Sequence, residues 1–383
     1  MRRRDASLED RGVTAKGLTR RNVLATGTAA VVAATGGIPL FNIGHAWSQD
    51  VAYDGGIFDA GGAVLRVGEW PGFWQENIRK LLLDEFEADF NCKIEYDGTW
   101  PFYPKYIAGG PQNPPNDTNN WNLLEVIKTD RAGDYFVGID EIKANVPNAN
   151  DLWDFALETG AGTTWAYNRM CYFFNTDKVD PAPVGFKSFW EERFDDHRRG
   201  TYIAVNGLQH LFFMTACHVW GGDHKNLEAG YDAMRRLFPV KLSDFTGNMQ
   251  TLLSRGEVDI AVMNEGEAYM MQDRGQPVGV THWDGKKALL TQTSTISRYS
   301  EPMQKKLSYA LLNRRLSPEF MTTFNAVFRY RPTNSKAKIP ENMINKGVVN
   351  TADAVKDFWI PDWNWFASVE ADVSEEVNDI FAG

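Results

Sequence analysis

The sequence contains few cysteines, and after its first fifty residues it has no apolar run long enough to cross a membrane. Its three cysteines in 383 residues are Cys92, Cys171 and Cys217. They are too few for a disulfide scaffold, and whether any two of them form a bridge is not decided by their spacing. Leu208–Trp220 is the longest later apolar run, and it is shorter than the roughly 20 residues that a spanning helix needs. A disulfide-rich domain and a membrane span in the later part of the chain are therefore not expected.

Motifs that mark the common enzyme classes are also missing. There is no G-x-G-x-x-G after a predicted strand, no P-loop, no G-x-S-x-G, no H-E-x-x-H and no C-x-x-C. His210 and His218 lie eight residues apart on one predicted helix, but no carboxylate lies in metal-ligand register with them. Glu265 and Glu267 could form an acid/base pair, although side chains two residues apart after a strand diverge as readily as they converge. An exported enzyme stays open only as an alternative.

The net charge of the chain bears on which kinds of molecule it can bind. The chain has 40 basic and 50 acidic side chains, which give a net charge of −10 at pH 7. An acidic surface argues against nucleic acid or an anionic membrane as the main partner. Apolar residues make up 43% of the chain, which is enough to build sizeable cores, and the length predicts about two domains.

The first 48 residues have the order of an export signal. Residues 1–22 carry a net charge of +4, an uncharged run follows from Val23 to Ile43, and Ala46-Trp47-Ser48 is a small-x-small cleavage site. One membrane-spanning helix is the alternative interpretation, but Gly36-Gly37 and Pro39 interrupt the apolar run. We therefore expect removal of residues 1–48, which leaves 33 basic and 47 acidic side chains and a net charge of −14.

The route of export is predicted by a pair of arginines. Arg20-Arg21 stands in Thr19-Arg-Arg-Asn-Val-Leu24, which resembles a twin-arginine signal with Val23 where Phe is commoner. The run that follows is rich in Ala, Gly and Thr and is only weakly hydrophobic, as this route prefers. The protein is therefore expected in the periplasm, exported by the twin-arginine route.

Strands alternate with helices along the rest of the chain, which predicts an α/β fold. Ala63–Val67 and Lys93–Tyr96 have the pattern of strands, and Phe73–Phe90 between them has helical periodicity. This order predicts a βαβ unit with a parallel strand pair. Further strands are expected at Asn122–Ile127, Thr201–Val205 and Glu257–Met263, and further helices at Leu208–Val219, after Asn226, at Met249–Leu253, at Met303–Leu316 and from Ser317-Pro318 to Phe328.

Aromatic and polar residues gather where these strands end. Glu69–Trp74 follows the first strand and Thr99–Tyr103 the second. Asn206-Gly207 follows the strand expected at Thr201–Val205, and Asn264-Glu265 follows the one expected at Glu257–Met263. Ligands of open α/β sheets bind outside the carboxyl ends of the strands. The chain has thirteen tryptophans, whose faces stack on cations or sugars, while Asn, Gln and Glu orient a ligand. Core packing is the alternative role for each tryptophan.

Several segments together resemble the periplasmic solute-binding proteins of ABC importers, specifically the spermidine/putrescine-binding group. The order and spacing of the segments carry this resemblance over nearly all of residues 62–383. The segments are Val64–Trp70, Gly162–Asn168, Phe174–Val179, Lys187–Glu192, Leu252–Ala261 and Arg329–Asn334.

The resemblance implies a two-lobed, type II periplasmic binding protein fold with a ligand in the cleft between the lobes. Lobe one is expected at 62–163 plus 290–333, and lobe two at 164–289 plus 334–383. A small-molecule ligand and an ABC permease are the implied partners, with no cofactor, no metal and a monomeric state. The expected ligand residues, carried over by position or placed at strand ends, are Glu69, Trp70, Trp100, Tyr103, Gly207, His210, Asn264, Glu265 and Gln292.

Departures from the polyamine-binding group change the expected ligand. Carboxylates of that group align with Gly207, His210 and Gln292 here, so only Glu69 and Glu265 remain as anions, and an unpaired buried ammonium is costly. A singly charged amine, a polyol or a sugar-like solute is therefore expected rather than a polyamine. No Tyr-Tyr pair is present, which argues against the iron of the ferric-binding relatives. An exported enzyme and a signalling partner of a membrane receptor remain as other readings.

Overall fold

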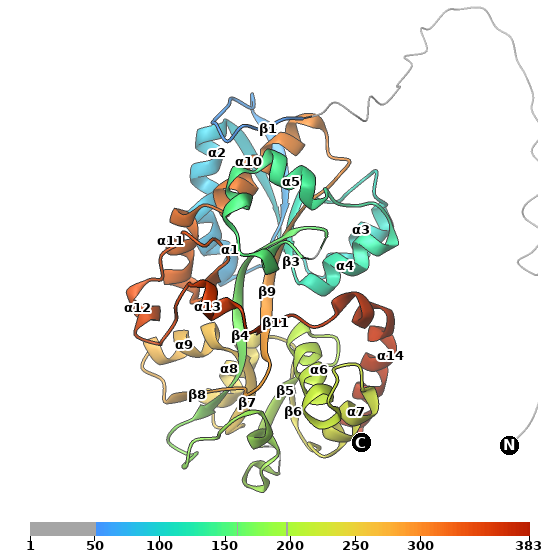
Figure 1. Ribbon diagram of the computed structural model, residues 1–383, viewed down its shortest axis with the longest axis vertical. Coiled ribbons are helices and arrows are strands. Elements are labelled where there is room, and N and C mark those ends of the chain that lie inside the picture. The colour runs from blue at the N-terminus through green and yellow to red at the C-terminus, as the bar shows by residue number, and fades with distance from the viewer. Residues whose placement is uncertain (1–50, 159, 197) are drawn as a thin grey trace, which may run out of the picture. The chain divides into compact units, whose positions relative to one another are not determined.

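The described part of the chain is organised around one mixed sheet. The computed structural model describes residues 51–383 except 159 and 197, so the expected export signal at 1–48 lies outside the described residues. The main strand order is β2-β1-β3-β9-β4-β7-β5-β6. At the side of this path, β8 and β10 (Arg331–Pro332) pair with β4, and β11 (Phe358–Trp359) pairs with β9. Helices flank the strands on both sides (Figure 1). The α/β class expected from the alternating pattern is confirmed.

One half of the sheet is formed by the first three strands. β1 (Ala63–Gly68) pairs in parallel with β2 (Cys92–Asp97) and with β3 (Thr118–Trp121). The helical segment between β1 and β2 consists of α1 (Phe73–Ile78), a π-helical turn and α2 (Asp84–Phe90). The predicted βαβ unit is therefore confirmed.

The other half contains β5 (Arg199–Tyr202), β6 (Lys241–Ser243) and β7 (Ile260–Asn264). β5 pairs in parallel with both β6 and β7. The expected strands at Thr201–Val205 and Glu257–Met263 thus exist, but β5 begins two residues earlier and β7 three residues later. The helices of this half are α6 (Gly207–Gly221), α7 (Leu227–Arg235), α8 (Thr246–Ser254) and α9 (Glu265–Asp273).

Two long strands connect the halves. The first part of β4 (Thr163–Asn175) pairs with β9 (Lys287–Ile296), and its last part pairs with β7 and with β8 (Val278–His282). Figure 1 shows β4 and β9 side by side between the two groups of strands. The register of the β4–β9 pair shifts between Thr164 and Ala166. Each half has its own hydrophobic core, and both cores draw on residues of these two strands.

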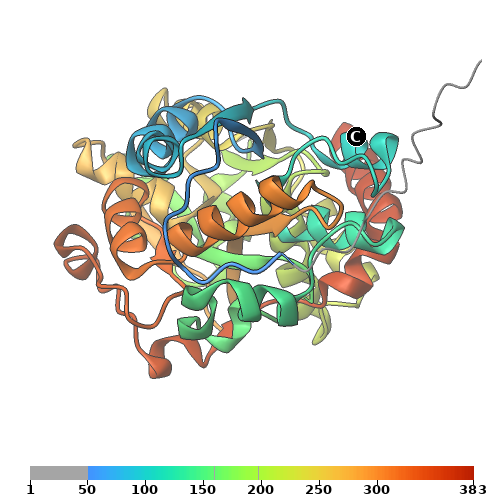
Figure 2. The same cartoon turned by 90° about the horizontal axis from the view of Figure 1, so that it is seen from above.

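The remaining helices cover the sheet and its strand ends. α10 (Pro302–Arg315) packs against β1 and β9, and Figure 2 shows it lying across the sheet. α11 (Pro318–Phe328) follows, and its predicted cap is present because the Ser317 hydroxyl accepts a hydrogen bond from the Phe320 amide at 3.2 Å. α3 (Tyr103–Gly109) and α4 (Leu123–Ala132) follow β2 and β3. α14 (Trp363–Ala382) packs against both α4 and α7.

The strand expected at Asn122–Ile127 is wrong, because this segment belongs to helix α4. Leu123, Leu124 and Ile127 are buried on one face at helical spacing, and the neighbouring Glu125 and Lys128 are good helix formers. The strand lies just before, at Thr118–Trp121, where all four residues are buried. Its polar sequence concealed it, since Thr118, Asn120 and Trp121 make tertiary hydrogen bonds that a hydropathy pattern does not show.

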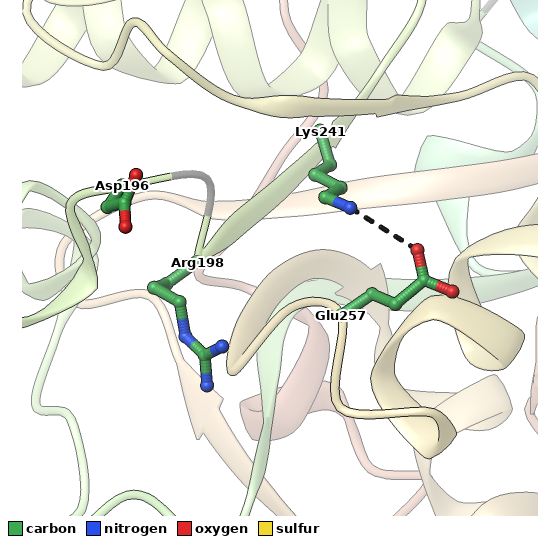
Figure 3. Close-up of a pocket in the computed structure, with 4 residues that line it drawn as sticks. All are labelled: Asp196, Arg198, Lys241 and Glu257. Carbon is green, nitrogen blue, oxygen red and sulfur yellow. Dashed lines mark hydrogen bonds and ion pairs between the residues drawn. The ribbon is translucent and has the colours of Figure 1, made fainter.

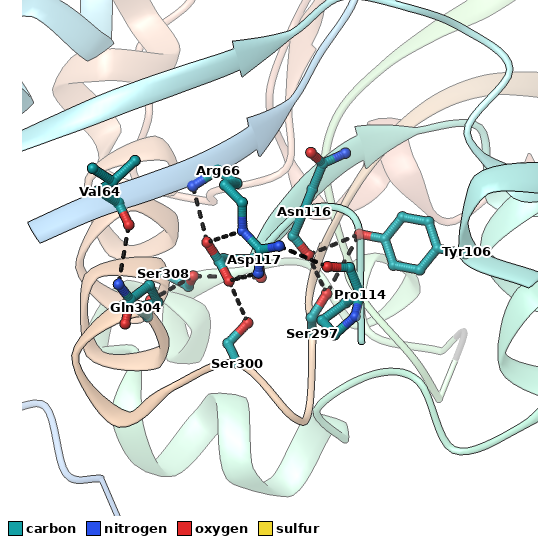
Figure 4. Close-up of polar contacts among 10 residues, drawn as sticks. All are labelled: Val64, Arg66, Tyr106, Pro114, Asn116, Asp117, Ser297, Ser300, Gln304 and Ser308. Atoms are coloured by element: carbon teal, nitrogen blue, oxygen red, sulfur yellow. Dashed lines mark hydrogen bonds and ion pairs between the residues drawn. The ribbon is translucent and has the colours of Figure 1, made fainter. Parts of the chain in front are cut away.

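A buried polar network fixes the loop that leads into β3. Arg66 on β1 donates to both carboxylate oxygens of Asp117, at 3.1 and 2.7 Å, and to the carbonyl of Pro114 at 2.9 Å. Asp117 also accepts the Ser300 hydroxyl at 2.8 Å, which links the loop to the segment before α10 (Figure 4). The network therefore holds β3, and the helix that follows it, in register with β1.

The three cysteines are free and buried, so the bridge that the sequence left open does not form. Among residues 51–383 as described, no helix is long and apolar enough to span a membrane. The same residues contain no cluster of His, Cys, Asp or Glu that could hold a metal ion.

Candidate ligand-binding site

The carboxyl ends of the strands from both halves of the sheet meet near Asn122 and Gly207. Asn122 follows β3 and Gly207 follows β5, and a Cβ built on Gly207 would lie 3.6 Å from the Asn122 side-chain nitrogen. Gly68, at the end of β1, has to be glycine, since a Cβ there would lie 1.6 Å from the Asn119 oxygen. The segment that follows β3 thus approaches the one that follows β5, and the end of β1 packs closely against β3. We call this region the strand-end site.

Glu69 comes directly after β1, but its carboxylate is committed to the interior. The side chain is fully buried, forms an ion pair with Arg315 and accepts the Trp74 indole N–H at 2.8 Å. Burial raises the pKa of Glu69, although Arg315 opposes this effect. The role of this residue is therefore to hold the end of β1 against α10.

Trp70 and Gln292 are brought together in what we call the Gln292 cluster. The Trp70 indole N–H donates to Gln292 Oε1 at 2.8 Å, and the Asn120 amide donates to the same oxygen at 3.1 Å. The Gln292 amide nitrogen donates to the Tyr330 hydroxyl at 3.2 Å, and Asn120 also accepts from Trp165 at 2.9 Å. The polar groups of this cluster form hydrogen bonds with one another. The half-buried Trp70 ring is therefore the part of the cluster that can contact a ligand.

Asn264 and Glu265 lie where β7 ends and α9 begins. Asn264 is the N-cap of α9, with its side-chain oxygen accepting from the Glu267 amide at 3.2 Å. Glu265 is fully buried and accepts from Arg331, with Nη2 to Oε2 at 3.0 Å, and from His282 Nε2 at 2.9 Å. Burial opposes its ionisation, but Arg331 and His282 prevail and hold the pKa of Glu265 well below its usual value.

The Glu265–Glu267 pair does not offer an acid and a base. Glu265 is held by Arg331 and His282, and Glu267 accepts the side-chain amide of Gln250 at 2.5 Å. A general base needs a carboxylate within reach of a substrate proton. The described contacts therefore give no support to the enzyme alternative.

The other expected residues gather around α4. Trp100, which is 45% exposed, donates its indole N–H to Glu125 Oε2 at 3.3 Å. Lys128 lies one turn further on α4, with its ammonium 5.0 Å from the centre of the Tyr103 ring and 2.6 Å from Glu370 Oε2 on α14. Together with His210, these residues form what we call the Glu125 cluster.

His210 joins this cluster from α6. Its ring is buried against Phe366, and Nε2 lies 3.7 Å from Glu370 Oε1. Burial lowers the pKa of His210, and Lys128 adds to this effect while Glu370 opposes it. His210 is therefore neutral at pH 7, and Glu370 has Lys128 as its cationic partner.

Two residues of the strand-end site were missed by the sequence analysis, namely Asn122 and Glu125. Asn122 is the N-cap of α4 but makes no capping hydrogen bond with its side chain. Glu125 is partly exposed and uses only Oε2, toward Trp100. The strand expected at Asn122–Ile127 hides both residues. As the start of helix α4, the same segment places the two side chains one turn apart, directly after the end of β3.

Two cavities lie elsewhere in the second half of the sheet. The larger, of about 510 Å³, is lined by Asp196, Arg198, Lys241 and Glu257, beside the amino ends of β5 and β6 (Figure 3). Lys241 forms an ion pair there with Glu257 at 3.3 Å, so the charged groups that line the cavity are already partly neutralised by each other. The smaller cavity, of about 210 Å³, lies beside Asn175 and Val278. Ligands of such sheets bind at carboxyl ends, so neither cavity is the expected site.

Comparison with known proteins supports the resemblance seen in the sequence. No family model matches the chain. The spermidine/putrescine-binding periplasmic protein of Escherichia coli (strain K12) is 22% identical over 190 residues, which cover 48% of this chain and 53% of that protein. The match thus spans about half the length of this curated relative.

Solved structures show a similar fold over most of the chain. An ABC transporter structure from Clostridium perfringens has a TM-score of 0.68 at 19% identity, covering 83% of this chain and 99% of that one. The spermidine/putrescine ABC transporter substrate-binding protein of Streptococcus pneumoniae has a TM-score of 0.63 at 17% identity, covering 84% and 100%. The curated relative and this second structure are solute-binding proteins rather than enzymes. The chain therefore has the two-lobed α/β fold of type II periplasmic solute-binding proteins, and its sequence is similar to the spermidine/putrescine-binding group.

Proposed function

We propose that this protein is the solute-binding component of an ABC importer, which captures a small polar solute and delivers it to a membrane permease. The observation that carries the proposal is the approach of strand ends from two half-sheets, which the long strands β4 and β9 connect. Such an arrangement lets a solute bind both halves at once, so that binding can change their relative orientation. The fold similarity supports the same proposal.

The proposed lobes are 62–163 plus 290–333, and 164–289 plus 334–383. β4 begins at Thr163, in agreement with the first boundary. α12 (Glu341–Ile344) packs through Met343 against Tyr269 of α9, and Trp363 and Phe366 of α14 belong to the core of the second half. These contacts support placing the C-terminal segment in lobe two.

We propose an amine, a polyol or a sugar-like molecule as the solute, rather than a polyamine. Glu69 and Glu265, the two anions expected at the site, are each paired with an arginine. Neither is then free to neutralise the several charges of spermidine or putrescine. Calorimetry with both polyamines is the direct check, and a sub-micromolar dissociation constant for either would refute this part of the proposal.

The experiment that tests the function is identification of the bound solute. The protein is purified without denaturation, the solute is released by acid, and mass spectrometry identifies it. The function predicts that the solute is recovered unchanged and that cells lacking the gene lose its uptake. Conversion of the solute by the pure protein would instead favour the enzyme alternative, and uptake that is unchanged in those cells would argue against the importer.

Export to the periplasm is also a proposal, supported by the periplasmic relative, and the twin-arginine route is proposed from Arg20-Arg21 alone. Changing both arginines to lysine should leave the precursor in the cytoplasm, because this route recognises the pair. Cell fractionation followed by immunoblotting measures the outcome. Normal export of the double variant would exclude the route but not the function.

A further inference from the structure

The carboxylates around the strand-end site differ in whether their charge is compensated. Glu69 pairs with Arg315, Glu265 with Arg331, and Glu370 with Lys128. Among the described residues, the Glu125 carboxylate forms no ion pair and accepts one hydrogen bond, from Trp100. Glu267 has no described ion pair either, but its carboxylate accepts the Gln250 side-chain amide at 2.5 Å. Glu125 is therefore a carboxylate of the strand-end site whose charge no described cation compensates.

The surroundings of Glu125 suit a cationic ligand. No described residue donates to its Oε1, its side chain is partly exposed, and the Trp100 ring beside it is 45% exposed. An indole face attracts an ammonium group, and a carboxylate oxygen accepts a short charge-assisted hydrogen bond from it. The Asn122 amide and the Tyr103 hydroxyl, which make no described hydrogen bond, lie on the same α3–α4 surface and are available to the rest of a ligand.

We infer that Glu125 and Trp100 bind the ammonium group of a small, singly charged amine, with the indole face against the cation and Glu125 Oε1 accepting its hydrogen bond. This inference rests on the proposed function and names the solute class within it. Of the three classes left open above, it selects the amine.

The charge of the cluster limits the ligand to one positive charge. Lys128 from α4 offsets Glu370 from α14, and His210 from α6 is neutral, so Glu125 contributes the net charge of −1. A second ammonium group would meet Lys128 instead of a free carboxylate. The same arrangement therefore predicts that a diamine is a poor ligand.

Glu125 is costly to ionise in the absence of a ligand. Burial raises its pKa to about 7, while Trp100 and Lys128 oppose the shift and Glu370 adds to it. A raised carboxyl pKa means that the folded state loses stability as pH rises from about 4.5 to 7. An ammonium ligand would neutralise the ionised carboxylate and so remove the cost of ionising it in a buried place. A residue that destabilises the unliganded protein in this way is expected to bind a ligand rather than to stabilise the fold.

The test uses three probes with the same four-carbon chain: n-butylamine with one ammonium group, putrescine with two, and 1-butanol with none. Calorimetry should show that the wild-type protein binds n-butylamine, and that it binds putrescine and 1-butanol at least about tenfold more weakly. Glu125→Gln and Trp100→Ala should each weaken n-butylamine binding about tenfold or more. Glu95→Gln, which removes one exposed carboxylate from β2, is the matched control and should bind normally.

Two readouts separate this role from a structural one. Glu125→Gln should raise the Tm of the unliganded protein by about 1–3 °C at pH 8 and by less at pH 5, where the wild-type side chain is protonated in the folded state and burial therefore costs it little. Wild-type affinity for n-butylamine, whose ammonium stays charged, should fall as pH drops from 8 to 6 because Glu125 takes up a proton.

The inference fails if 1-butanol binds as well as n-butylamine, if n-butylamine does not bind, or if Glu125→Gln lowers the Tm and leaves affinity unchanged. The proposed function can hold when this inference fails. If the natively bound solute proves to be a neutral or anionic molecule that the cell imports through this protein, the importer function is supported and the amine site is refuted. Unchanged uptake in cells lacking the gene would instead refute the importer function.

Discussion

At the scale of single residues, burial alone does not distinguish a structural carboxylate from a binding one. Glu265 is fully buried and has Arg331 and His282 as partners, whereas Glu125 is partly exposed and has only the Trp100 indole. The same change to glutamine should therefore have opposite effects at the two positions. A buried carboxylate is structural when a cation distant in sequence neutralises it, and it is available for binding when no such cation is present.

Glu265→Gln should lower the free energy of unfolding at pH 7 by about 3–5 kcal/mol, because it leaves the buried Arg331 without its anion. Urea denaturation measures the change. Glu257→Gln is the control, since its exposed pair with Lys241 should contribute less than about 1 kcal/mol. Unchanged stability with a large loss of solute affinity would return Glu265 to the ligand-binding set that its position after β7 predicted.

The same residue predicts an acid dependence. Because the folded-state pKa of Glu265 is depressed, its contribution to stability is present above the unfolded value of about 4.5 and is lost as pH falls below it. The wild-type protein should therefore lose stability steeply below about pH 4.5. The Glu265→Gln variant should lose less over the same interval, and equal slopes in urea denaturation series would contradict the assignment.

At the scale of secondary-structure elements, α14 contacts helices of both proposed lobes. Its Glu370 pairs with Lys128 of α4, the Asn364 carbonyl accepts from Arg131 of α4 at 2.7 Å, and Glu376 pairs with Arg235 of α7. The contacts to α4 are made in the first half of the helix and the contact to α7 in the second. α14 is therefore placed to hold α4 and α7 together.

Lys128→Gln should weaken this connection. It removes a charge-assisted hydrogen bond and leaves the mostly buried Glu370 without a cation, so the free energy of unfolding should fall by about 1–2 kcal/mol. Arg235→Gln breaks the exposed pair with Glu376 on the same helix and should cost less than about 1 kcal/mol. If urea denaturation shows the same loss of unfolding free energy for both variants, the contact between α14 and α4 contributes no more to stability than the exposed pair with α7.

At the scale of the whole described molecule, the two half-sheets are joined by strands rather than by flexible loops. We propose that the hinge between the lobes lies at Gly162–Trp165, which includes the register shift of β4, and at Leu289–Gln292 of β9. Gly162 has a φ of 77°, a conformation that side chains with a Cβ rarely adopt. An irregular strand pair of this kind can absorb a rotation without breaking the core of either half.

Solute binding should therefore reduce the radius of gyration, as the two lobes close around the hinge. Small-angle X-ray scattering of the protein stripped of solute, with and without a saturating amount of the identified solute, measures the change. A polar compound that does not bind serves as the control. The same radius in both states would contradict closure while leaving binding itself intact.

The sequence by itself determined the local features of this protein. Helical periodicity and capping residues identified α1, α2, α6, α10 and α11, because these signals act within a few residues along the chain. The ordered segments around Trp70, Trp165 and Arg331 also identified the fold, which the structural comparisons confirm. The tryptophans at the ends of β1 and β2 were correctly placed after strands, while their role in ligand binding stays a prediction.

Only the tertiary structure decided which polar side chains are paired with another part of the protein and which are available to a ligand. Arg315 lies 246 positions from Glu69, and Arg331 lies 66 positions from Glu265, so no local pattern reveals that these pairs neutralise each other. The polar strand Thr118–Trp121 was hidden for the same reason, and with it the helical position of Glu125. Charge compensation depends on distance in space, and the fold alone brings these groups within a few ångströms of one another.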